Sequence, residues 1–413
     1  MPSNRLAEVL DAPPNKRPAI LEGQWLDTGA TAAFAALNPV SVLEGSGDAL
    51  AELPRWICWH ADQFCTGAAV GYLSYELARF FETLPLTAST SLPDLSFAYY
   101  PRFEKLPHLE PEPADAELSS PPEIRSNFDE RSYAETVETI RDFIAAGDIY
   151  QANLTCQFSA RLAGVSPERI YSRLSRLEPS FGAFLKGPQR TIISNSPERF
   201  FRVMGDRILA SPIKGTIARP PDPAFDAQCV SALLSSGKDL AENVMIVDLL
   251  RNDLGRICRY ETIGTRMFEV RTLPHLFHLV SHIEGTLRAG TGLVDILRAL
   301  FPCGSITGAP KIRAMEILAE VEKVPRGVSM GAIGIIKGQP GTAGCEMDFN
   351  VAIRTMTIEE DVATLNVGGG IVFDSRAETE REEMMLKARP LLEALGASRA
   401  FEPQMLQACA LER

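Results

Sequence analysis

The irregular order of helical and strand-like segments is the feature of this sequence that most constrains its fold. Helical patterns occupy three segments, over residues 133–146, 239–254 and 378–395. Runs with the composition of strands occupy 191–194, 279–283, 347–354 and 363–367. A barrel of parallel strands or a doubly wound sheet requires helices and strands in regular alternation. The sequence therefore predicts an α+β fold with large, mostly antiparallel sheets.

Signals at the ends of these segments support the helical interpretation. Gly147 follows the first helix and suits a C-terminal cap, and a turn-like pair at 374–375 precedes the third helix. In the second helix, apolar residues recur at a spacing that places them on one face, and they are Leu240, Val244, Val247 and Leu254. We expect this face to be buried.

A proline- and acid-rich segment at 106–122 predicts a linker or an exposed loop. With 413 residues, the chain is long enough for two domains or for one large layered unit. We expect an N-terminal region over 1–122, a larger domain over 123–398 and a C-terminal tail over 399–413. Within the N-terminal region, the apolar block at 71–77 is expected to pack as a strand or a short helix.

The charge and the apolar content of the chain exclude several classes of protein. The net charge is -12 at pH 7, which argues against a nucleic-acid surface, because phosphate binding requires clustered lysine and arginine. No apolar run approaches the roughly 20 residues of a membrane helix, and the first residues lack the apolar run of a signal peptide. The eight cysteines are dispersed without a CxxC pair, as in reduced proteins of the cytoplasm. We therefore expect a cytoplasmic protein with neither nucleic acid nor membrane as a partner.

Two familiar motifs are approached but not matched. The segment at 304–311 is rich in glycine and ends in lysine, but a phosphate-binding loop has four residues between its glycines where this segment has three. His275, His278 and His282 could suggest zinc, yet no glutamate lies between the last two, so the HExxH pattern is absent. One catalytic or structural histidine with two bystanders explains the cluster better than a zinc site.

Several acidic residues occupy positions that suit proton transfer or metal binding. Glu198 lies in a tight polar turn, and Glu242 lies in the first turns of the second predicted helix. Glu380 and Glu383 share one face of the third helix with Lys387. The alternative for that helix is a solvated acidic face with an ion pair between Glu383 and Lys387.

Cationic and glycine-rich positions complete this set. Lys214 lies between Pro212 and Gly215, which predict a turn, and partial removal from water there would lower its pKa and make it a nucleophile. The alternative is an ordinary solvated lysine. Arg354 and the glycines at 368–370, which follow a predicted strand, suit an anion such as a carboxylate; the alternatives are a surface ion pair and a tight turn. Together these residues predict a site for a small polyanion, with Mg²⁺ bridging its carboxylate to protein glutamates.

Eight segments occur in the order in which they occur in one enzyme family. They lie at 147–154, 196–200, 241–249, 278–281, 304–311, 352–355, 369–372 and 380–387. On these segments the chain resembles the chorismate-utilising enzymes, which include anthranilate, aminodeoxychorismate, isochorismate and salicylate synthases. The resemblance runs from about residue 128 to 395 and includes a weaker match at 71–77. It implies that 123–398 is the catalytic domain, with the chorismate-binding fold of antiparallel sheets packed as a sandwich with flanking helices.

Two positions choose among the reactions of this family. Isochorismate and salicylate synthases carry a lysine where this chain has Gln151, and a glutamine amide cannot take a proton from water. Ammonia is therefore the expected nucleophile. The segment around Lys214 reads Pro-Ile-Lys-Gly-Thr, as in aminodeoxychorismate synthases, whereas anthranilate synthases typically have alanine in place of the lysine. The resemblance thus implies amination of chorismate to 4-amino-4-deoxychorismate, on the route to 4-aminobenzoate and folate; the alternative is synthesis of anthranilate.

The resemblance also implies a role for each candidate residue. Lys214 would attack the ring of chorismate as an uncharged amine, Glu198 would act as the general acid, and His278 would lie near the ring. The expected metal ligands are Glu242, Glu380 and Glu383, and the expected substrate contacts are Gln151, Thr307, Arg354, Gly369, Gly370 and Lys387. One departure is that Ser329 and Met330 occupy a stretch that often carries a tyrosine in the family. The lost phenol contact would cost about 1 kcal/mol.

A second subunit is the expected source of ammonia. Glutaminases of the relevant class place their cysteine in a Gly-x-Cys-x-Gly segment, whereas Cys303 follows Pro302. The resemblance therefore implies a glutamine amidotransferase partner, component II of such synthases, or direct use of ammonium. A non-catalytic relative is disfavoured because Glu198, Glu242 and Lys214 are all present.

Overall fold

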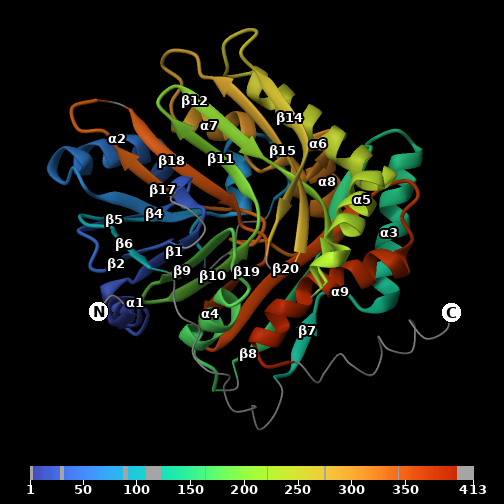
Figure 1. The fold of residues 1–413 in the computed structure, drawn as a ribbon, viewed down its shortest axis with the longest axis horizontal. Coiled ribbons are helices and arrows are strands. Elements are labelled where there is room, and N and C mark those ends of the chain that lie inside the picture. The colour runs from blue at the N-terminus through green and yellow to red at the C-terminus, as the bar shows by residue number, and fades with distance from the viewer. Residues whose placement is uncertain are drawn as a thin grey trace.

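Two ten-stranded sheets pack face to face, and helices cover their outer faces (Figure 1). This computed structural model describes residues 3–27, 32–86, 92–107, 122–162, 164–220, 222–273, 276–342 and 344–397. All strand pairs in both sheets are antiparallel. The predicted α+β fold with mostly antiparallel sheets is confirmed.

The first sheet, called sheet A, has the strand order β16-β8-β20-β19-β10-β9-β1-β2-β6, with β7 paired to β8. Its strands are β1 (Ala19–Gly23), β2 (Ala32–Ala36), β6 (Glu104–Pro107), β7 (Ile124–Ser126), β8 (Gln151–Arg161), β9 (Phe181–Lys186), β10 (Arg190–Ser196), β16 (Gly308–Ala309), β19 (Thr355–Glu359) and β20 (Val362–Ile371). The second sheet, called sheet B, has the order β13-β15-β12-β11-β18-β17-β4-β5-β3, with β14 paired to β15. Its strands are β3 (Ser41–Gly45), β4 (Ala68–Leu73), β5 (Leu95–Tyr100), β11 (Arg199–Met204), β12 (Arg207–Ser211), β13 (Ile213–Ala218), β14 (Gly264–Thr272), β15 (Leu276–Thr286), β17 (Ala332–Gly338) and β18 (Cys345–Val351).

The helices pack on the two outer faces of this pair of sheets. They are α1 (Ser3–Leu10), α2 (Gly47–Gln63), α3 (Glu130–Ala145), α4 (Pro167–Ser175), α5 (Asp226–Ser235), α6 (Gly237–Gly255), α7 (Leu293–Leu300), α8 (Lys311–Glu322) and α9 (Ala377–Ala394). One apolar cluster joins α2, α6 and α7 to sheet B, and a second joins α3, α4, α8 and α9 to sheet A. A third cluster contains residues of both sheets and forms the core between them. None of the described helices is both long and apolar enough to cross a lipid bilayer.

Strands from the N-terminal region complete both sheets. In the N-terminal region, β1, β2 and β6 extend sheet A, whereas β3, β4 and β5 extend sheet B. The two regions of the chain therefore share their cores. The middle of the proline-rich segment, 108–121, and the predicted tail at 399–413 lie outside the described residues. The apolar block at 71–77 combines both expected forms, because β4 ends at Leu73 and a short 3-10 helix (Tyr75–Phe80) follows.

The three predicted helices are present as α3, α6 and α9. Helix α3 begins at Glu130 because the Asp129 side chain accepts a hydrogen bond from the backbone N–H of Ser132 at 2.7 Å. Gly147 follows α3 with a φ of 84°, the left-handed conformation expected of a helix cap. The predicted buried stripe on α6 is wrong at Val244, whose side chain is 48% exposed.

The buried face of α6 differs from the predicted one because the helix packs on sheet B through a neighbouring face. The buried residues of α6 are Asn243, Ile246, Val247, Leu250, Asp253 and Leu254. Strand boundaries also differ from prediction. Strand β18 ends at Val351, before the expected 354, and β20 continues through the glycines to Ile371. The glycines were expected to follow a strand, and they are instead part of it.

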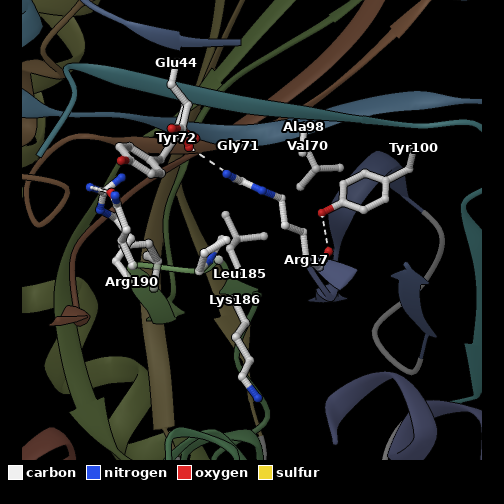
Figure 2. A pocket seen from close by; sticks show the side chains of 15 residues that line it. Arg17, Glu44, Val70, Gly71, Tyr72, Ala98, Tyr100, Leu185, Lys186 and Arg190 are labelled. Carbon is white, nitrogen blue, oxygen red and sulfur yellow. Dashed lines mark hydrogen bonds and ion pairs between the residues drawn. The ribbon is translucent and has the colours of Figure 1, made fainter. Parts of the chain in front are cut away.

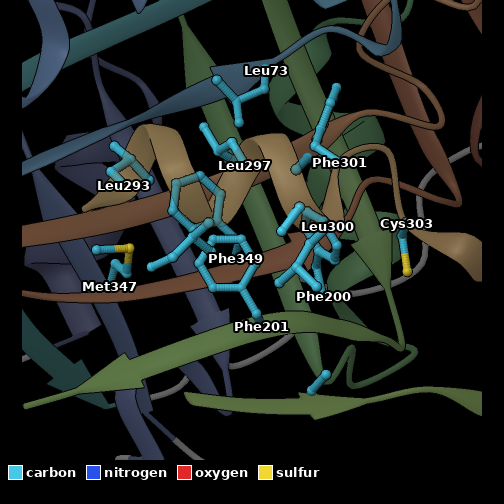
Figure 3. Packing of buried hydrophobic residues seen from close by; sticks show 14 of the residues in the cluster. Leu73, Phe200, Phe201, Leu293, Leu297, Leu300, Phe301, Cys303, Met347 and Phe349 are labelled. Atoms are coloured by element: carbon cyan, nitrogen blue, oxygen red, sulfur yellow. The ribbon is translucent and has the colours of Figure 1, made fainter. Parts of the chain in front are cut away.

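A stack of aromatic rings forms the core between α7 and sheet B (Figure 3). The Phe201 and Phe349 rings are stacked with their centroids 5.0 Å apart. Gly334 on the neighbouring strand leaves room for the Phe349 ring, because a Cβ there would lie 2.3 Å from its Cδ1. A larger residue at Gly334 would therefore displace this ring.

Replacing Phe349 with leucine should lower the free energy of unfolding by about 1–2 kcal/mol, because the smaller side chain leaves part of this space unfilled. The measurement is the shift in the urea unfolding midpoint. Phe373, which is 57% exposed, is the matched control, and its replacement with leucine should leave the midpoint unchanged. An equal shift in both variants would contradict the burial argument.

Candidate functional site

The predicted site residues gather where the chain crosses between the two sheets. Strand β10 of sheet A leads directly into β11 of sheet B, and β18 of sheet B leads into β19 of sheet A. Glu198 lies in the first crossing and Arg354 in the second. The remaining predicted residues come from β8, β13, β15, β20, α6 and α9 and from the segment before β16, which brings both sheets to one site. In the view of Figure 1, α6 and α9 lie on the same side of the molecule.

Glu198 is a buried acid whose carboxyl group titrates near neutral pH. Its side chain is 4% exposed, and the Ser305 hydroxyl donates to its Oε1 at 2.8 Å. Burial raises the pKa of Glu198 to about 7, although the Ser305 hydrogen bond and the charge of Lys214 act in the opposite direction. An acid with this pKa can donate a proton to a leaving group at neutral pH.

Lys214 lies inside the site, with its amine directed at a carboxylate. It belongs to the edge strand β13, where the pairing with β15 is irregular between Ile213 and Thr216. Its side chain is 14% exposed, and its Nζ lies 3.4 Å from Glu242 Oε2. The predicted turn around Lys214 is therefore a distorted strand. The amine must leave Glu242 before its nitrogen lone pair can attack a substrate.

Each predicted metal ligand forms an ion pair with a lysine. In addition to the Lys214–Glu242 pair, Lys238 Nζ lies 3.5 Å from Glu380 Oε1, and Lys387 Nζ lies 2.7 Å from Glu383 Oε1. The pairing between Glu383 and Lys387 along α9 is thus present, but it belongs to a larger cluster.

The lysines also determine how these groups titrate. Burial raises the pKa of Glu383, but the neighbouring lysines, Lys387 first, lower it by more, so that the pKa is lowered overall. Burial lowers the pKa of Lys238, but Glu380 and the other two glutamates raise it by more. All of these charges therefore act on one another.

The donor chemistry of this cluster suits Mg²⁺, which prefers carboxylate oxygens. Glu380 is 3% exposed and accepts a hydrogen bond from the Ser375 hydroxyl at 2.7 Å, which orients its carboxylate. In the described part of the chain, however, no three acidic, histidine or cysteine side chains lie close enough to bind a metal as they stand. The glutamates have the oxygen ligands that Mg²⁺ prefers, but their carboxylate oxygens form ion pairs with lysines.

The glycine segment makes room for two other predicted residues. A Cβ on Gly370 would lie 2.0 Å from Gln151 Nε2, and a Cβ on Gly369 would lie 3.6 Å from Glu380 Oε2 and 3.7 Å from Lys387 Nζ. Both glycines pair with β8 in sheet A. The alternative of a tight turn is therefore wrong, because the backbone belongs to a strand. The missing side chains let Gln151, Glu380 and Lys387 approach β20.

Arg354 contributes a cation to the site, and His278 contributes a neutral imidazole ring. Arg354 has a φ of 49°, and its guanidinium makes no ion pair or side-chain hydrogen bond with the described residues. Burial, followed by the charges of Arg354 and Arg271, lowers the pKa of His278 to about 3, so that its ring is neutral at physiological pH. Thr216 Oγ1 lies 2.8 Å from His278 Nδ1, while His278 Nε2 is buried without a hydrogen-bond partner. The arrangement leaves one cation and one ring nitrogen available to a ligand.

Three further residues, Thr307, Gln151 and Ser329, are buried. Thr307 is fully buried, and its hydroxyl lies within hydrogen-bond distance of the carbonyls of Cys303 and Gly304. Gln151 is 1% exposed, and its Oε1 has no partner. The Ser329 hydroxyl donates to the Asn366 carbonyl at 3.2 Å and accepts from the Asn366 N–H. The residue in the place of the family tyrosine thus hydrogen-bonds to β20.

Within the described residues, His278 and His282 belong to no group of three side chains that could bind a metal. His278 and His282 lie on β15, and His282 Nδ1 lies 2.9 Å from the Ser211 hydroxyl. His275 lies outside the described residues. Seven of the eight cysteines are in the described part of the chain, and all of these are free thiols.

Three residues of the site were not predicted from the sequence. Ser305 orients Glu198, Lys238 pairs with Glu380, and Arg271 lies directly across the β14–β15 ladder from His278. The position of Lys238 four residues before Glu242 in a helix could have indicated that the two share a face. Nothing local marks Ser305 or Arg271, because their partners are distant in sequence.

Two cavities lie away from these residues. One of about 180 Å³ opens between β9–β10 and strands β3, β4 and β5 (Figure 2). Its Arg17 is paired with Glu44 at 3.2 Å, and the Tyr100 hydroxyl donates to the Arg17 carbonyl at 2.7 Å. A second cavity of about 120 Å³ lies beside Glu322 and Arg326. Neither is lined by a predicted site residue, and the charges of Arg17 and Glu44 are satisfied by each other.

Known proteins resemble this chain over most of its length. The family model described as chorismate binding enzyme matches residues 28–393. The chain is 37% identical over 354 residues to anthranilate synthase component 1 of Methanothermobacter thermautotrophicus, covering 80% of this chain and 75% of that protein. It is 36% identical over 354 residues to aminodeoxychorismate synthase component 1 of Escherichia coli, covering 80% and 77%. The solved structure of anthranilate synthase component I from Streptococcus pneumoniae has a TM-score of 0.76 at 28% identity, covering 88% of this chain and 92% of that one. The two named activities are matched to similar degrees.

Proposed function

Because the chain belongs to the chorismate binding enzymes, we propose that it converts chorismate to 4-amino-4-deoxychorismate, as an aminodeoxychorismate synthase component I. The observation that carries this proposal is the amine of Lys214, largely buried beside Glu242 and close enough to Glu198 for its charge to act on the pKa of that acid. A nucleophile and a general acid are thus present together.

The environment of Gln151 favours ammonia over water as the second nucleophile. Its buried Oε1 lacks a hydrogen-bond partner, so it can accept a hydrogen bond from ammonia. An amide does not take a proton at neutral pH, and therefore it cannot activate water as a base. This supports amination over hydroxylation.

Protein groups of opposite charge would bind the two carboxylates of chorismate, the acidic groups acting through Mg²⁺. Arg354, which has no acid partner among the described residues, would grip one carboxylate of chorismate, and the strand backbone at Gly369 and Gly370 would lie against it. Glu242, Glu380 and Glu383 would hold Mg²⁺. When bound, the ion neutralises the other carboxylate and makes the ring more electron-poor. Lys387 and Thr307 would complete the pocket, with neutral His278 near the ring.

The reaction would proceed by two substitutions. The uncharged amine of Lys214 attacks the ring carbon beside the one that bears the carboxylate, and the double bonds shift. The ring hydroxyl leaves as water after Glu198 gives it a proton. Ammonia then adds at the vacated carbon, the double bonds shift back, and the bond to Lys214 breaks. The amine ends where the hydroxyl had been, and each step keeps the electron count of the ring.

Ammonia would come from a glutamine amidotransferase, component II of the synthase, or from ammonium in solution. The product would be an intermediate on the route to 4-aminobenzoate and folate, and the enzyme would act in the cytoplasm. These assignments follow from the proposed reaction.

Replacing Arg354 with glutamine should raise KM for chorismate by about tenfold to a hundredfold, because a charged hydrogen-bond partner of the carboxylate is lost. Steady-state kinetics at saturating Mg²⁺ would measure this effect. Arg389, an exposed arginine of α9, is the control, and its replacement with glutamine should leave KM unchanged. A fall in kcat at unchanged KM would argue against a binding role for Arg354.

Incubation of the purified protein with chorismate, Mg²⁺ and ammonium, followed by mass spectrometry, tests the proposed function. Formation of 4-amino-4-deoxychorismate supports it. The alternative, anthranilate synthesis, is favoured by the similarity to the Methanothermobacter protein and predicts anthranilate together with pyruvate. Isochorismate as the product would contradict the argument from Gln151.

A further inference from the structure

The carboxylate cluster contains one more lysine than the proposed reaction uses. Lys214 is the proposed nucleophile and Lys387 a proposed substrate contact, whereas Lys238 has no role in that chemistry. Nevertheless, Lys238 is the lysine that pairs with Glu380, the most deeply buried of the three glutamates.

The position of Lys238 in α6 is electrostatically unfavourable in the absence of a nearby carboxylate. It is the second residue of α6, and a lysine in the first turn of a helix is repelled by the positive end of the helix dipole. The carboxylate of Glu380 is 3% exposed and faces Lys238 from α9. A buried carboxylate needs a nearby cation, because burial without one is costly. The ion pair therefore offsets an unfavourable position at each end.

The exposure of the lysines distinguishes Lys238 from Lys214. The side chain of Lys238 is 51% exposed and that of Lys214 is 14% exposed. A half-exposed lysine can turn its ammonium group into water while its carbon chain stays on the surface. Lys238 can thus leave its glutamate without moving the backbone.

We propose that Lys238 is an internal counter-ion of Glu380, and that a divalent cation binds to the glutamates by displacing it. The inference rests on the proposed magnesium site. It explains why the glutamates have the chemistry of a metal site and yet form three lysine pairs. It also makes Lys238 a determinant of cation affinity, because the ion must compete with a charge already present.

Binding of Mn²⁺ to the full-length protein, measured by titration calorimetry without chorismate, tests this role. Lys238→Gln should bind Mn²⁺ about fivefold more tightly than the wild type, because a competing positive charge is removed. High salt should reduce the difference, since a half-exposed pair is screened. Lys16→Gln removes one charge from an exposed lysine outside the cluster, and its affinity should stay at the wild-type value.

A second variant isolates the pair. In the Glu380→Gln background, replacing Lys238 should change Mn²⁺ affinity much less, because the carboxylate it occupies is gone. Thermal unfolding gives an independent readout. Lys238→Gln should melt at a lower temperature than the wild type in EDTA, and added Mn²⁺ should raise its melting temperature by more.

An unchanged or weaker Mn²⁺ affinity in Lys238→Gln would overturn the inference. So would weaker chorismate binding at unchanged Mn²⁺ affinity, since Lys238 would then be a substrate contact. These outcomes leave the proposed reaction standing, because the assay involves no turnover. If the wild-type protein and every variant bind no Mn²⁺, both the counter-ion role and the proposed magnesium site fail.

Discussion

Lys214→Ala should lower the rate of chorismate consumption by at least about a thousandfold, because the variant has no amine to form the first bond to the ring. Chorismate should still bind in the presence of Mg²⁺, since Arg354 and the glutamates remain. Single-turnover kinetics would measure the rate, and equilibrium dialysis would measure binding.

Lys214→Arg separates the charge of this residue from its nucleophilicity. The guanidinium can pair with Glu242 as the amine does, but it stays protonated and cannot attack the ring. We therefore expect an inactive protein that retains the charge balance of the cluster. Normal turnover in either variant would remove Lys214 from the proposed mechanism.

Glu198→Gln should reduce kcat by about a hundredfold to ten-thousandfold, because glutamine has the shape of glutamic acid but cannot donate an acidic proton. The amide oxygen can still accept the Ser305 hydrogen bond that Glu198 accepts. We therefore expect the fold around the crossing from β10 to β11 to persist. Rapid-mixing measurements of product formation would give the rate.

The pH dependence provides a second measurement on the same variant. Burial raises the pKa of Glu198 to about 7, so the proton-donating form predominates below that pH. The wild-type rate should fall as the pH rises through about 7, whereas the residual rate of Glu198→Gln should lack this step. An unchanged step in the variant would assign it to another group.

The same shift predicts the direction of a stability effect. Because the folded-state pKa lies above that of the unfolded chain, the folded protein holds the proton more tightly between the two values. This contribution to stability is complete below the unfolded-state pKa and is lost as the pH rises through about 7. Glu198→Gln should not lose it, and thermal unfolding at pH 5 and pH 8 would compare the two proteins. A wild-type melting temperature with the same pH dependence as the variant would contradict the buried titration.

Local patterns predicted those parts of the fold that depend on neighbouring residues. Helix α3 follows from the capping groups at its two ends, Asp129 and Gly147, and α9 follows from the pattern of residues along it. The fold class follows from the irregular order of the elements. The motifs containing Glu198 and Lys214 indicated the chemistry of the site, because nucleophiles and acids must be of particular residue types.

Other features depended on how distant segments pack. The helix pattern selected Val244 for burial, but the face of α6 that is buried was decided by sheet B. The glycines at 368–370 look like a turn in the sequence, and only the register with β8 shows that they continue a strand.

The sequence by itself determined which residue types this protein has for catalysis and the order of its secondary structure. The tertiary structure decided which charges face one another. Lys238 and Glu380 lie on different helices, and Glu198 and Arg354 lie in separate crossings between the sheets. Secondary structure arises from interactions between near neighbours in the chain, whereas electrostatic pairing depends on distance in space. Only the packing of both sheets and their helices brings these distant residues within range.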